Sequence, residues 1–274
     1  MKKIFILIAF VQFQFIYSQI IVSDYPLSKI IEETSGLEII GDYFITHNDS
    51  KGYPILYYLS KEGKIIKRRE VKSAVNKDWE DITKDDKYIY ISDTGNNYSN
   101  RKDLKIYKIP INEDSTEKTQ IISFDYPEQD SFKINTNTIF DAEGLISIDD
   151  KLLIFTKNRK KKITEIYSIP KIQGDYRAKK IKTLNVNSII TGADYNSDFK
   201  LLALTSTIDF TEYYLITVSD FNIYSNNDYQ INMIKIPIGK TQVEAVKIID
   251  KNNFWITSED ESGTKHARLL RLKI

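Results

Sequence analysis

A five-fold internal repeat constrains the fold of this chain more than any other feature of its sequence. In each unit an acidic or hydroxyl residue opens a short apolar run, and 11 to 13 residues later a Ser or Thr closes the next apolar run. The openers are Ser35, Glu80, Glu143, Asp194 and Glu244, and the closers are Thr46, Ser92, Thr156, Thr205 and Thr257. A period of about 50 residues indicates an architecture built of repeated units.

Each unit contains β-rich runs separated by charged turns. The run that ends at the closer reads YFIT, YIYIS, LLIFT, LLALT or NFWIT in successive units, and the next run includes the near-identical IYKIP at 106–110 and IYSIP at 166–170. Short runs rich in β-branched and aromatic residues, bounded by turn residues, are typical of strands. With a fourth run in units one to four, the pattern predicts four strands per unit, and helix only around residues 28–33.

The two ends of the chain complement each other. The fifth unit stops at Ile274 without a fourth strand, whereas the extended run QIIVSDY at 19–25 precedes the first opener. A ring in which the N-terminal strand completes the last repeat has no exposed sheet edges at its closure. We therefore predict an all-β fold, a β-propeller of five four-stranded blades. Six blades remain an alternative because Glu80 and Glu143 are 63 residues apart, although the surplus at 127–138 reads as an inserted loop.

The first 18 residues read as a secretory signal peptide. Lys2 and Lys3 precede a largely apolar stretch, and Ser18 provides a small residue before a cleavage site. The pattern predicts a signal peptide at 1–18, a single propeller domain at 19–274 and a periplasmic or extracellular location. An uncleaved anchor is the alternative. We expect no membrane span after signal removal, since no other stretch reaches the roughly 18 apolar residues that a span requires.

Composition excludes several classes of function. The chain has no Cys, so disulfides, a thiol nucleophile and a cysteine-linked lipid are excluded. Without Lys2 and Lys3, 37 basic residues remain of the 39, against 38 acidic ones, which gives a net charge of −1 and does not suggest a nucleic-acid partner. The sequence also lacks a nucleophile elbow, an HExxH motif, a P-loop and a dinucleotide-binding glycine pattern.

The openers should lie around one mouth of the central channel. In an up-and-down blade the start of the first strand is next to the end of the second, and the innermost strands line the channel. Carboxylates that converge there repel one another unless cations, protons or hydrogen-bond donors compensate them. We predict a Ca²⁺ site, because Ca²⁺ prefers oxygen ligands. The candidate ligands are the carboxylates of Glu80, Glu143, Asp194 and Glu244, together with amide side chains at the strand ends, which Asn48, Asn96 and Asn158 supply.

The same mouth collects the least generic residues of the chain. His47 and Asp93 are candidates for proton transfer if the mouth is catalytic. The other predicted mouth residues are Asn48, Asp49, Asn97, Arg101, Lys157, Asn158 and Glu259. The alternative is that the acids accept hydrogen bonds from backbone N–H groups, that Lys157 and Arg101 balance their charge, and that His47 is a turn residue.

The segments ETSGL, THNDS, DWEDI, DTGNN followed by Arg101, and DAEGL resemble those of secreted bacterial β-propeller proteins akin to the SdiA-regulated and esterase-like phytase families. That group is itself similar to the lactonase, gluconolactonase and paraoxonase propellers. The resemblance implies a calcium site at the channel mouth, for which the rough counterparts by position, and hence the predicted metal ligands, are Glu80, Asn96, Glu143, Asp194 and Glu244. It also implies a catalytic His pair, for which this chain offers only His47 at the mouth.

Three functions follow as hypotheses. The first is an exported propeller with a Ca²⁺-binding acidic mouth that binds a small molecule or a protein partner. The second is a metal-dependent hydrolase of lactones or phosphoesters that uses the same mouth. The third is a structural propeller of the cell envelope without a metal. We expect a monomer in each case, and the sequence leaves open whether the protein is an enzyme.

Overall fold

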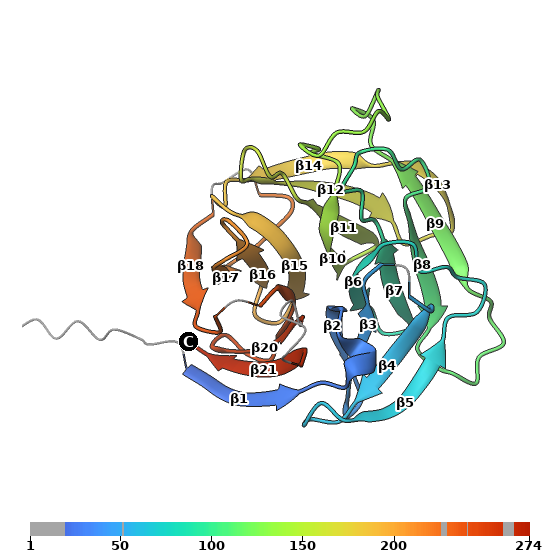
Figure 1. The fold of residues 1–274 in the computed structure, drawn as a ribbon. Coiled ribbons are helices and arrows are strands. Elements are labelled where there is room, and N and C mark those ends of the chain that lie inside the picture. The colour runs from blue at the N-terminus through green and yellow to red at the C-terminus, as the bar shows by residue number, and fades with distance from the viewer. Residues whose placement is uncertain (1–19, 51, 226–228, 240, 260–265) are drawn as a thin grey trace, which may run out of the picture.

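The chain folds as a five-bladed β-propeller (Figure 1). The computed structural model describes residues 20–274 except 51, 226–228, 240 and 260–265, so the predicted signal peptide lies outside the described residues. Five small antiparallel sheets surround a central axis, which confirms the predicted fold and excludes six blades. No helix in the described residues is long and apolar enough to cross a membrane.

Within each blade the strands follow one another from the axis outwards. The innermost strands are β2 (Thr34–Ile40), β6 (Trp79–Lys84), β10 (Ala142–Ile148), β15 (Ile189–Asn196) and β19 (Val243–Ile248). The second strands are β3 (Tyr43–Asn48), β7 (Tyr88–Asp93), β11 (Lys151–Thr156), β16 (Leu201–Thr207) and β20 (Asn253–Ser258). The third strands are β4 (Ile55–Leu59), β8 (Lys105–Pro110), β12 (Thr164–Pro170), β17 (Tyr213–Val218) and β21 (Arg268–Lys273). The outer strands are β5 (Ile65–Glu70), β9 (Gln120–Asp125), β14 (Lys179–Leu184), β18 (Ile231–Ile236) and β1 (Ile20–Pro26).

The ring closes through the N-terminal strand, as predicted. Strand β1 pairs antiparallel with β21, from Ile20 opposite Lys273 to Pro26 opposite Arg268, and so becomes the outer strand of the fifth blade. The surplus at 127–138 contains no strand and lies in the connection between β9 and β10. The one short 3-10 helix of the described residues, Lys29–Ile31, lies within the segment predicted to be helical.

One strand departs from the regular pattern. Strand β13 (Gly174–Arg177) lies between β12 and β14 in the chain, yet it pairs parallel with β9 of the second blade. It gives that sheet a fifth strand and covers its outer edge, a position at which exposed backbone groups otherwise invite aggregation. This strap links the second and third blades.

The apolar core lies between neighbouring blades, where both tryptophans are found. Trp79 is fully buried and contacts the ring of His47 on the first blade at 5.4 Å between centroids. Trp255 of the fifth blade packs against Phe44 of the first at 4.8 Å. Large aromatics contribute much apolar area at such contacts, so these pairs hold adjacent sheets together.

Each innermost strand has a β-bulge near its start. The pairing register shifts between Trp79 and Asp81, between Ala142 and Gly144, and between Val243 and Ala245, which leaves one residue of each strand outside the ladder. Strands β2 and β15 have the same irregularity at the corresponding point. Since a bulge re-aims the side chain at that point, the five bulges set which residues face the channel entrance.

Candidate functional site

Three of the bulges place a glutamate at one end of the channel, here called the acidic end. The residues outside the ladder are Glu80, Glu143 and Glu244, and each of them is at least nine-tenths buried. The closers lie beside the bulges, as the repeat predicts: Ser92 is paired with Asp81, and Thr257 with Ala245. The acidic end is therefore a product of the repeat itself.

The predicted position of Asp194 is wrong. In β15 the bulge falls at Thr191, three residues earlier, and Asp194 lies near the opposite end of its strand. The hydroxyl of Thr191 donates to the carbonyl of Val243 at 2.6 Å and joins the fourth blade to the fifth. The sequence pattern chose Asp194 by its distance from the closer Thr205. The β15–β16 hairpin is longer than those of the other blades, so this distance leads to Asp194 and not to the bulge residue Thr191.

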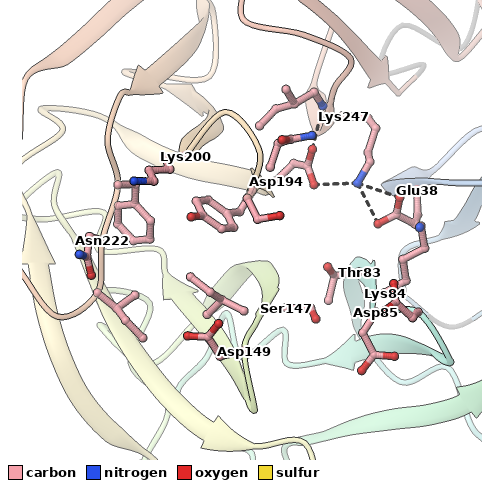
Figure 2. A pocket seen from close by; sticks show the side chains of 18 of the residues that line it. Glu38, Thr83, Lys84, Asp85, Ser147, Asp149, Asp194, Lys200, Asn222 and Lys247 are labelled. Atoms are coloured by element: carbon pink, nitrogen blue, oxygen red, sulfur yellow. Dashed lines mark hydrogen bonds and ion pairs between the residues drawn. The ribbon is translucent and has the colours of Figure 1, made fainter.

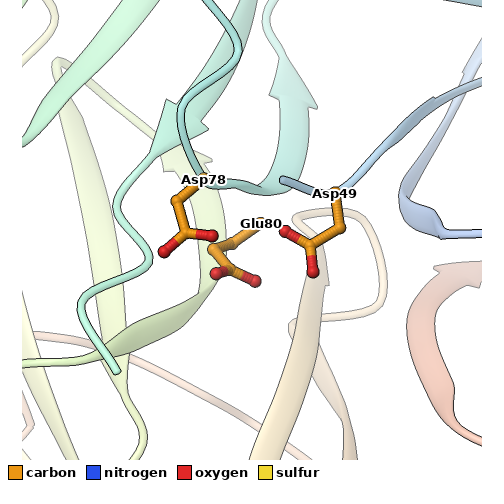
Figure 3. A group of neighbouring side chains, drawn as sticks. All are labelled: Asp49, Asp78 and Glu80. Carbon is orange, nitrogen blue, oxygen red and sulfur yellow. The ribbon is translucent and has the colours of Figure 1, made fainter. Parts of the chain in front are cut away.

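Asp49, Asp78 and Glu80 form the most compact group of acids at the acidic end (Figure 3). One carboxylate oxygen from each lies within 4.8 Å of the others. Asp78 and Glu80 are two residues apart at the start of β6, and Asp49 follows β3 of the neighbouring blade. Asp49 and Asp78 are half-buried, whereas Glu80 is buried, so the group is open to solvent on one side.

Glycine at position 95 allows this group to form. A Cβ atom at Gly95 would lie 2.1 Å from Oε1 of Glu80 and 2.4 Å from Oδ2 of Asp78. The DTGNN turn, which contains this glycine, therefore packs its backbone directly against the two carboxylates. No other residue fits there without displacing them, since real Cβ atoms do not approach so closely.

A second acidic group is joined to the first through Glu80. Carboxylate oxygens of Glu80, Asp141 and Glu143 also lie within 4.8 Å of one another. Here cations are built in: Nζ of Lys157 lies 2.6 Å from Glu143, and a guanidinium nitrogen of Arg159 lies 3.0 Å from Asp141. The predicted role of Lys157 as a counter-ion agrees with this contact.

Glu80 has no such partner. No hydrogen bond or ion pair among the described residues includes the carboxylate of Glu80, and Oδ1 of Asp49 is fully buried without a hydrogen bond. Burial raises the pKa of Glu80 and of Asp49 well above their ordinary values, and the neighbouring carboxylates raise them further. The same causes raise the pKa of Asp78 to about 6. The group therefore needs protons or a bound cation.

Glu244 belongs to the same end but lies nearer the fifth blade. Burial, followed by the charge of Glu259, raises its pKa well above the ordinary value, while Lys157 opposes the shift. Glu259 follows β20, and its carboxylate accepts a hydrogen bond from Gln242 at 2.8 Å. Both predicted residues thus place a carboxyl group at the acidic end.

The predicted asparagines are close by, but their side chains serve the loops. Oδ1 of Asn96 accepts from the backbone N–H of Arg101, and its Nδ2 donates to the carbonyl of Phe140. Oδ1 of Asn158 accepts from the N–H of Lys161 in a turn.

Asn97 and Asn48 have similar local roles. Oδ1 of Asn97 accepts from Arg159, and Nδ2 of Asn48 donates to the carbonyl of Ile30 at 2.7 Å. The amide oxygen of Asn96 thus already accepts one hydrogen bond within a loop, and its role as a metal ligand stays a prediction.

The two candidates for proton transfer are buried in other contacts. His47 is fully buried against Trp79, and burial lowers its pKa to about 4. It lies between the blades and not at the channel mouth, contrary to the prediction. Asp93 is also buried and forms an ion pair with Arg101 at 2.8 Å, which fixes the DTGNN turn.

Asp78, Asp141 and Arg159 also belong to this end, although they were not predicted from the sequence. A signal for the two aspartates was present, because both precede a glutamate opener by two residues, in DWE and in DAE. Residues two apart in a strand share a face, so an Asp-x-Glu pair in adjacent blades predicts four clustered carboxylates. No comparable pattern identifies Arg159, whose contact with Asp141 depends on the loop after β11.

The side chain of Asp81 reaches across the channel, at a level between the acidic end and the opposite end. Its fully buried Oδ2 accepts hydrogen bonds from the N–H of Leu145 on β10 at 2.8 Å and of Ala193 on β15 at 3.2 Å. Oδ1 accepts from Ile82, and burial raises the pKa of this carboxyl well above its ordinary value. The equivalent positions of the repeat in the other blades carry only small residues: Gly36, Gly144, Gly192 and Ala245.

The opposite end, here called the lysine end, opens into a funnel of about 960 Å³ (Figure 2). Nζ of Lys247 lies 2.7 Å from Oε1 and 2.9 Å from Oε2 of Glu38, and 2.8 Å from Oδ1 of Asp194. Asp194 also accepts from the N–H of Ile248. The cation that compensates these buried acids is therefore part of the chain.

Comparison with known proteins shows the fold alone. The chain is similar to the PQQ-bound aldose sugar dehydrogenase of Streptomyces coelicolor, with a TM-score of 0.51, 10% identity, and coverage of 93% of this chain and 98% of that one. It is similar to a putative oxidoreductase (glucose dehydrogenase) of Thermus thermophilus, with a TM-score of 0.50, 9% identity, and coverage of 93% and 99%. No protein-family model and no curated protein matches the sequence.

Proposed function

We propose that this protein is an exported β-propeller that binds Ca²⁺ at Asp49, Asp78 and Glu80 and uses the occupied acidic end to bind a ligand or partner. Export rests on the signal-like residues 1–18. The resemblance of ETSGL, DWEDI and DAEGL to the SdiA-regulated and esterase-like phytase group supports the same proposal.

The uncompensated carboxylate of Glu80 carries the proposal. Its neighbours Glu143 and Asp141 each have a Lys or Arg partner at 3.0 Å or less, whereas Glu80 has none among the described residues. An ionised carboxylate buried without a partner is costly, so the arrangement favours a cation that enters from solvent. Asp49 and Asp78 are only half-buried, which leaves the cation a path from solvent to Glu80.

The chemistry of the donors favours Ca²⁺. All three side chains offer carboxylate oxygens, and no Cys or described His nitrogen faces the group. Ca²⁺ takes six to eight oxygen ligands with flexible geometry, so three protein side chains leave positions for water and for oxygen atoms of a ligand. The open side of the group is where such a ligand would approach.

Binding is better supported than hydrolysis. A hydrolase needs a proton carrier beside the metal, but His47 is buried between blades and Asp93 is held by Arg101. PQQ chemistry is not part of the proposal either, because PQQ is a polycarboxylate and the acidic end already has excess negative charge.

Calorimetric titration of the metal-free protein with Ca²⁺ tests the proposal. We expect saturable binding at one site, and we expect Glu80→Gln to weaken it at least about tenfold, since one charged ligand is lost. Glu70→Gln, a change at an exposed strand end, is the matched control and should bind like the wild type. Absence of Ca²⁺ binding would instead support a structural propeller.

A further inference from the structure

We propose that the funnel at the lysine end is a second binding site and that it takes a neutral polyhydroxylated small molecule of the size of a mono- or disaccharide. The hollow is within the range of about 300–1,000 Å³ that is common for small-molecule sites. All five blades contribute to its wall, and it lies beyond Asp81 from the acidic end. The inference does not depend on the Ca²⁺ proposal.

The floor of the funnel excludes a metal ion. The ammonium of Lys247 already occupies the point between Glu38 and Asp194, with three carboxylate oxygens at 2.7–2.9 Å. The two carboxylates favour the charged form of Lys247 and raise its pKa, although burial opposes this shift. A second cation at this point would be repelled.

The charges of the wall also disfavour an anionic ligand. The lining residues include four lysines and six acids, and two of those acids, Glu38 and Asp194, share a single lysine at the floor. A carboxylate or phosphate on the ligand would face this excess of negative charge. Mixed charges of both signs instead offer donors and acceptors side by side, which suits hydroxyl groups, because each hydroxyl both donates and accepts.

Two hydroxyls of the funnel are free to bind a ligand. Thr83 and Ser147 lie across the funnel from Lys247 (Figure 2), and no hydrogen bond among the described residues includes either hydroxyl. Thr83 is 6% exposed and is among the residues that line the hollow. A ligand between these hydroxyls and the carboxylates of Glu38 and Asp194 would have polar partners on both sides.

An aromatic wall completes the site. Tyr195 lines the funnel and is held edge-on against the buried Phe221 at 5.8 Å between centroids. Tyr224 lines its rim and is largely exposed. The C–H face of a sugar ring packs well against aromatic side chains, so the funnel combines the apolar and polar contacts that a polyol requires.

Saturation-transfer NMR and calorimetry with D-glucose, cellobiose and gluconate test this proposal. We expect millimolar or tighter binding of at least one neutral sugar, and at least about tenfold weaker binding of gluconate, because like charges at close range are repelled. Ser147→Phe, which fills the funnel, should abolish binding, whereas Ser131→Phe in an exposed loop should not.

Two further variants separate this site from the acidic end. Thr83→Val removes only a hydroxyl and should weaken sugar binding roughly two- to tenfold. Asp49→Asn should leave sugar binding unchanged while it weakens Ca²⁺ binding. The proposal is overturned if no neutral sugar binds, if binding persists in Ser147→Phe, or if gluconate binds more tightly than the neutral sugars.

Discussion

The two ends of the channel solve the same electrostatic problem in different ways. The same innermost strands bring buried carboxylates together at both ends. At the lysine end a single ammonium of the chain contacts both acids within 2.9 Å. At the acidic end Lys157 contacts Glu143, and the trio of Asp49, Asp78 and Glu80 has no cation of its own among the described residues. A built-in cation gives a fixed structure, whereas a missing one leaves a site for a mobile ion.

The largest expected effect is at the lysine end. Lys247→Met keeps most of the apolar stem but leaves Glu38 and Asp194 buried without a counter-ion, which should lower the free energy of unfolding by about 3–5 kcal/mol. Urea denaturation at pH 7 measures this loss. Lys84→Met is the control, at a half-buried lysine of the same funnel that is not part of this ion pair, and it should change stability by less than about 0.5 kcal/mol.

That loss should also depend on pH. Without the lysine, the two acids can remain buried only by taking up protons, so the deficit should shrink between pH 7 and pH 4. A deficit that stays constant over this range would show that the charge of Lys247 is not the cause.

A smaller loss is expected at Asp81, between the two ends. Asp81→Ala leaves the N–H groups of Leu145 and Ala193 without this acceptor, and each unsatisfied buried group costs about 1–3 kcal/mol. We expect a total of about 2–4 kcal/mol in urea denaturation, and a smaller loss for Asp81→Asn, which retains one acceptor oxygen. If Asp81→Ala matches the wild type in stability, the cross-channel bonds are not important for the ring.

The acidic end should respond to pH when the protein is free of metal. Burial raises the folded-state pKa of Asp78 to about 6, above the ordinary value of 3.8, so its stabilising contribution is complete below pH 4 and is lost as the pH rises through 6. Relative to Asp78→Asn in EDTA, the wild type should lose about 1–2 kcal/mol between pH 4.5 and 7.5, a value reduced for partial solvent screening.

Saturating Ca²⁺ should remove this trend, because the bound ion requires the ionised carboxylates. At 100 times its Kd a ligand that binds only the folded state adds about 2.7 kcal/mol. A pH profile of the melting temperature with EDTA and with Ca²⁺ checks both statements. Parallel profiles would contradict the assignment of Asp78 to the site.

The smallest expected change in the free energy of unfolding is that of Glu80→Gln, and its sign shows whether the chain itself satisfies this carboxylate. In EDTA at pH 7, Glu80→Gln should raise the free energy of unfolding by about 0.5–1.5 kcal/mol, because the neutral amide removes the cost of burying this carboxyl in ionised form or of protonating it. Thermal unfolding measures the difference, and Glu70→Gln should leave it near zero. A destabilised Glu80→Gln would indicate that the chain satisfies this carboxylate internally, which would remove the basis of the Ca²⁺ proposal.

Much of the fold could be predicted from the sequence because it depends on local pattern. Strand runs such as LLIFT and IYSIP are rich in β-forming residues and end at turn residues, and the repeat fixes their number. The unassigned run at 19–25 and the lack of a fourth run in the fifth unit were enough to predict closure, which the pairing of β1 with β21 confirms. The strap β13 could not be predicted, because its partner β9 lies about 50 residues earlier and nothing local specifies a parallel pairing.

The sequence alone determined that carboxylates would recur at the start of the innermost strands, since Glu80, Glu143 and Glu244 occupy the same place in the repeat. Only the tertiary structure decided which acids share a site. A bulge that shifts the register by one residue turns a side chain to another face. Glu80 and Asp81 therefore lie in different surroundings, and Asp194 contacts Lys247 and does not reach the acidic end. Burial and the placement of each Lys and Arg then decide which carboxylates are compensated, and these are long-range properties that no spacing along the chain encodes.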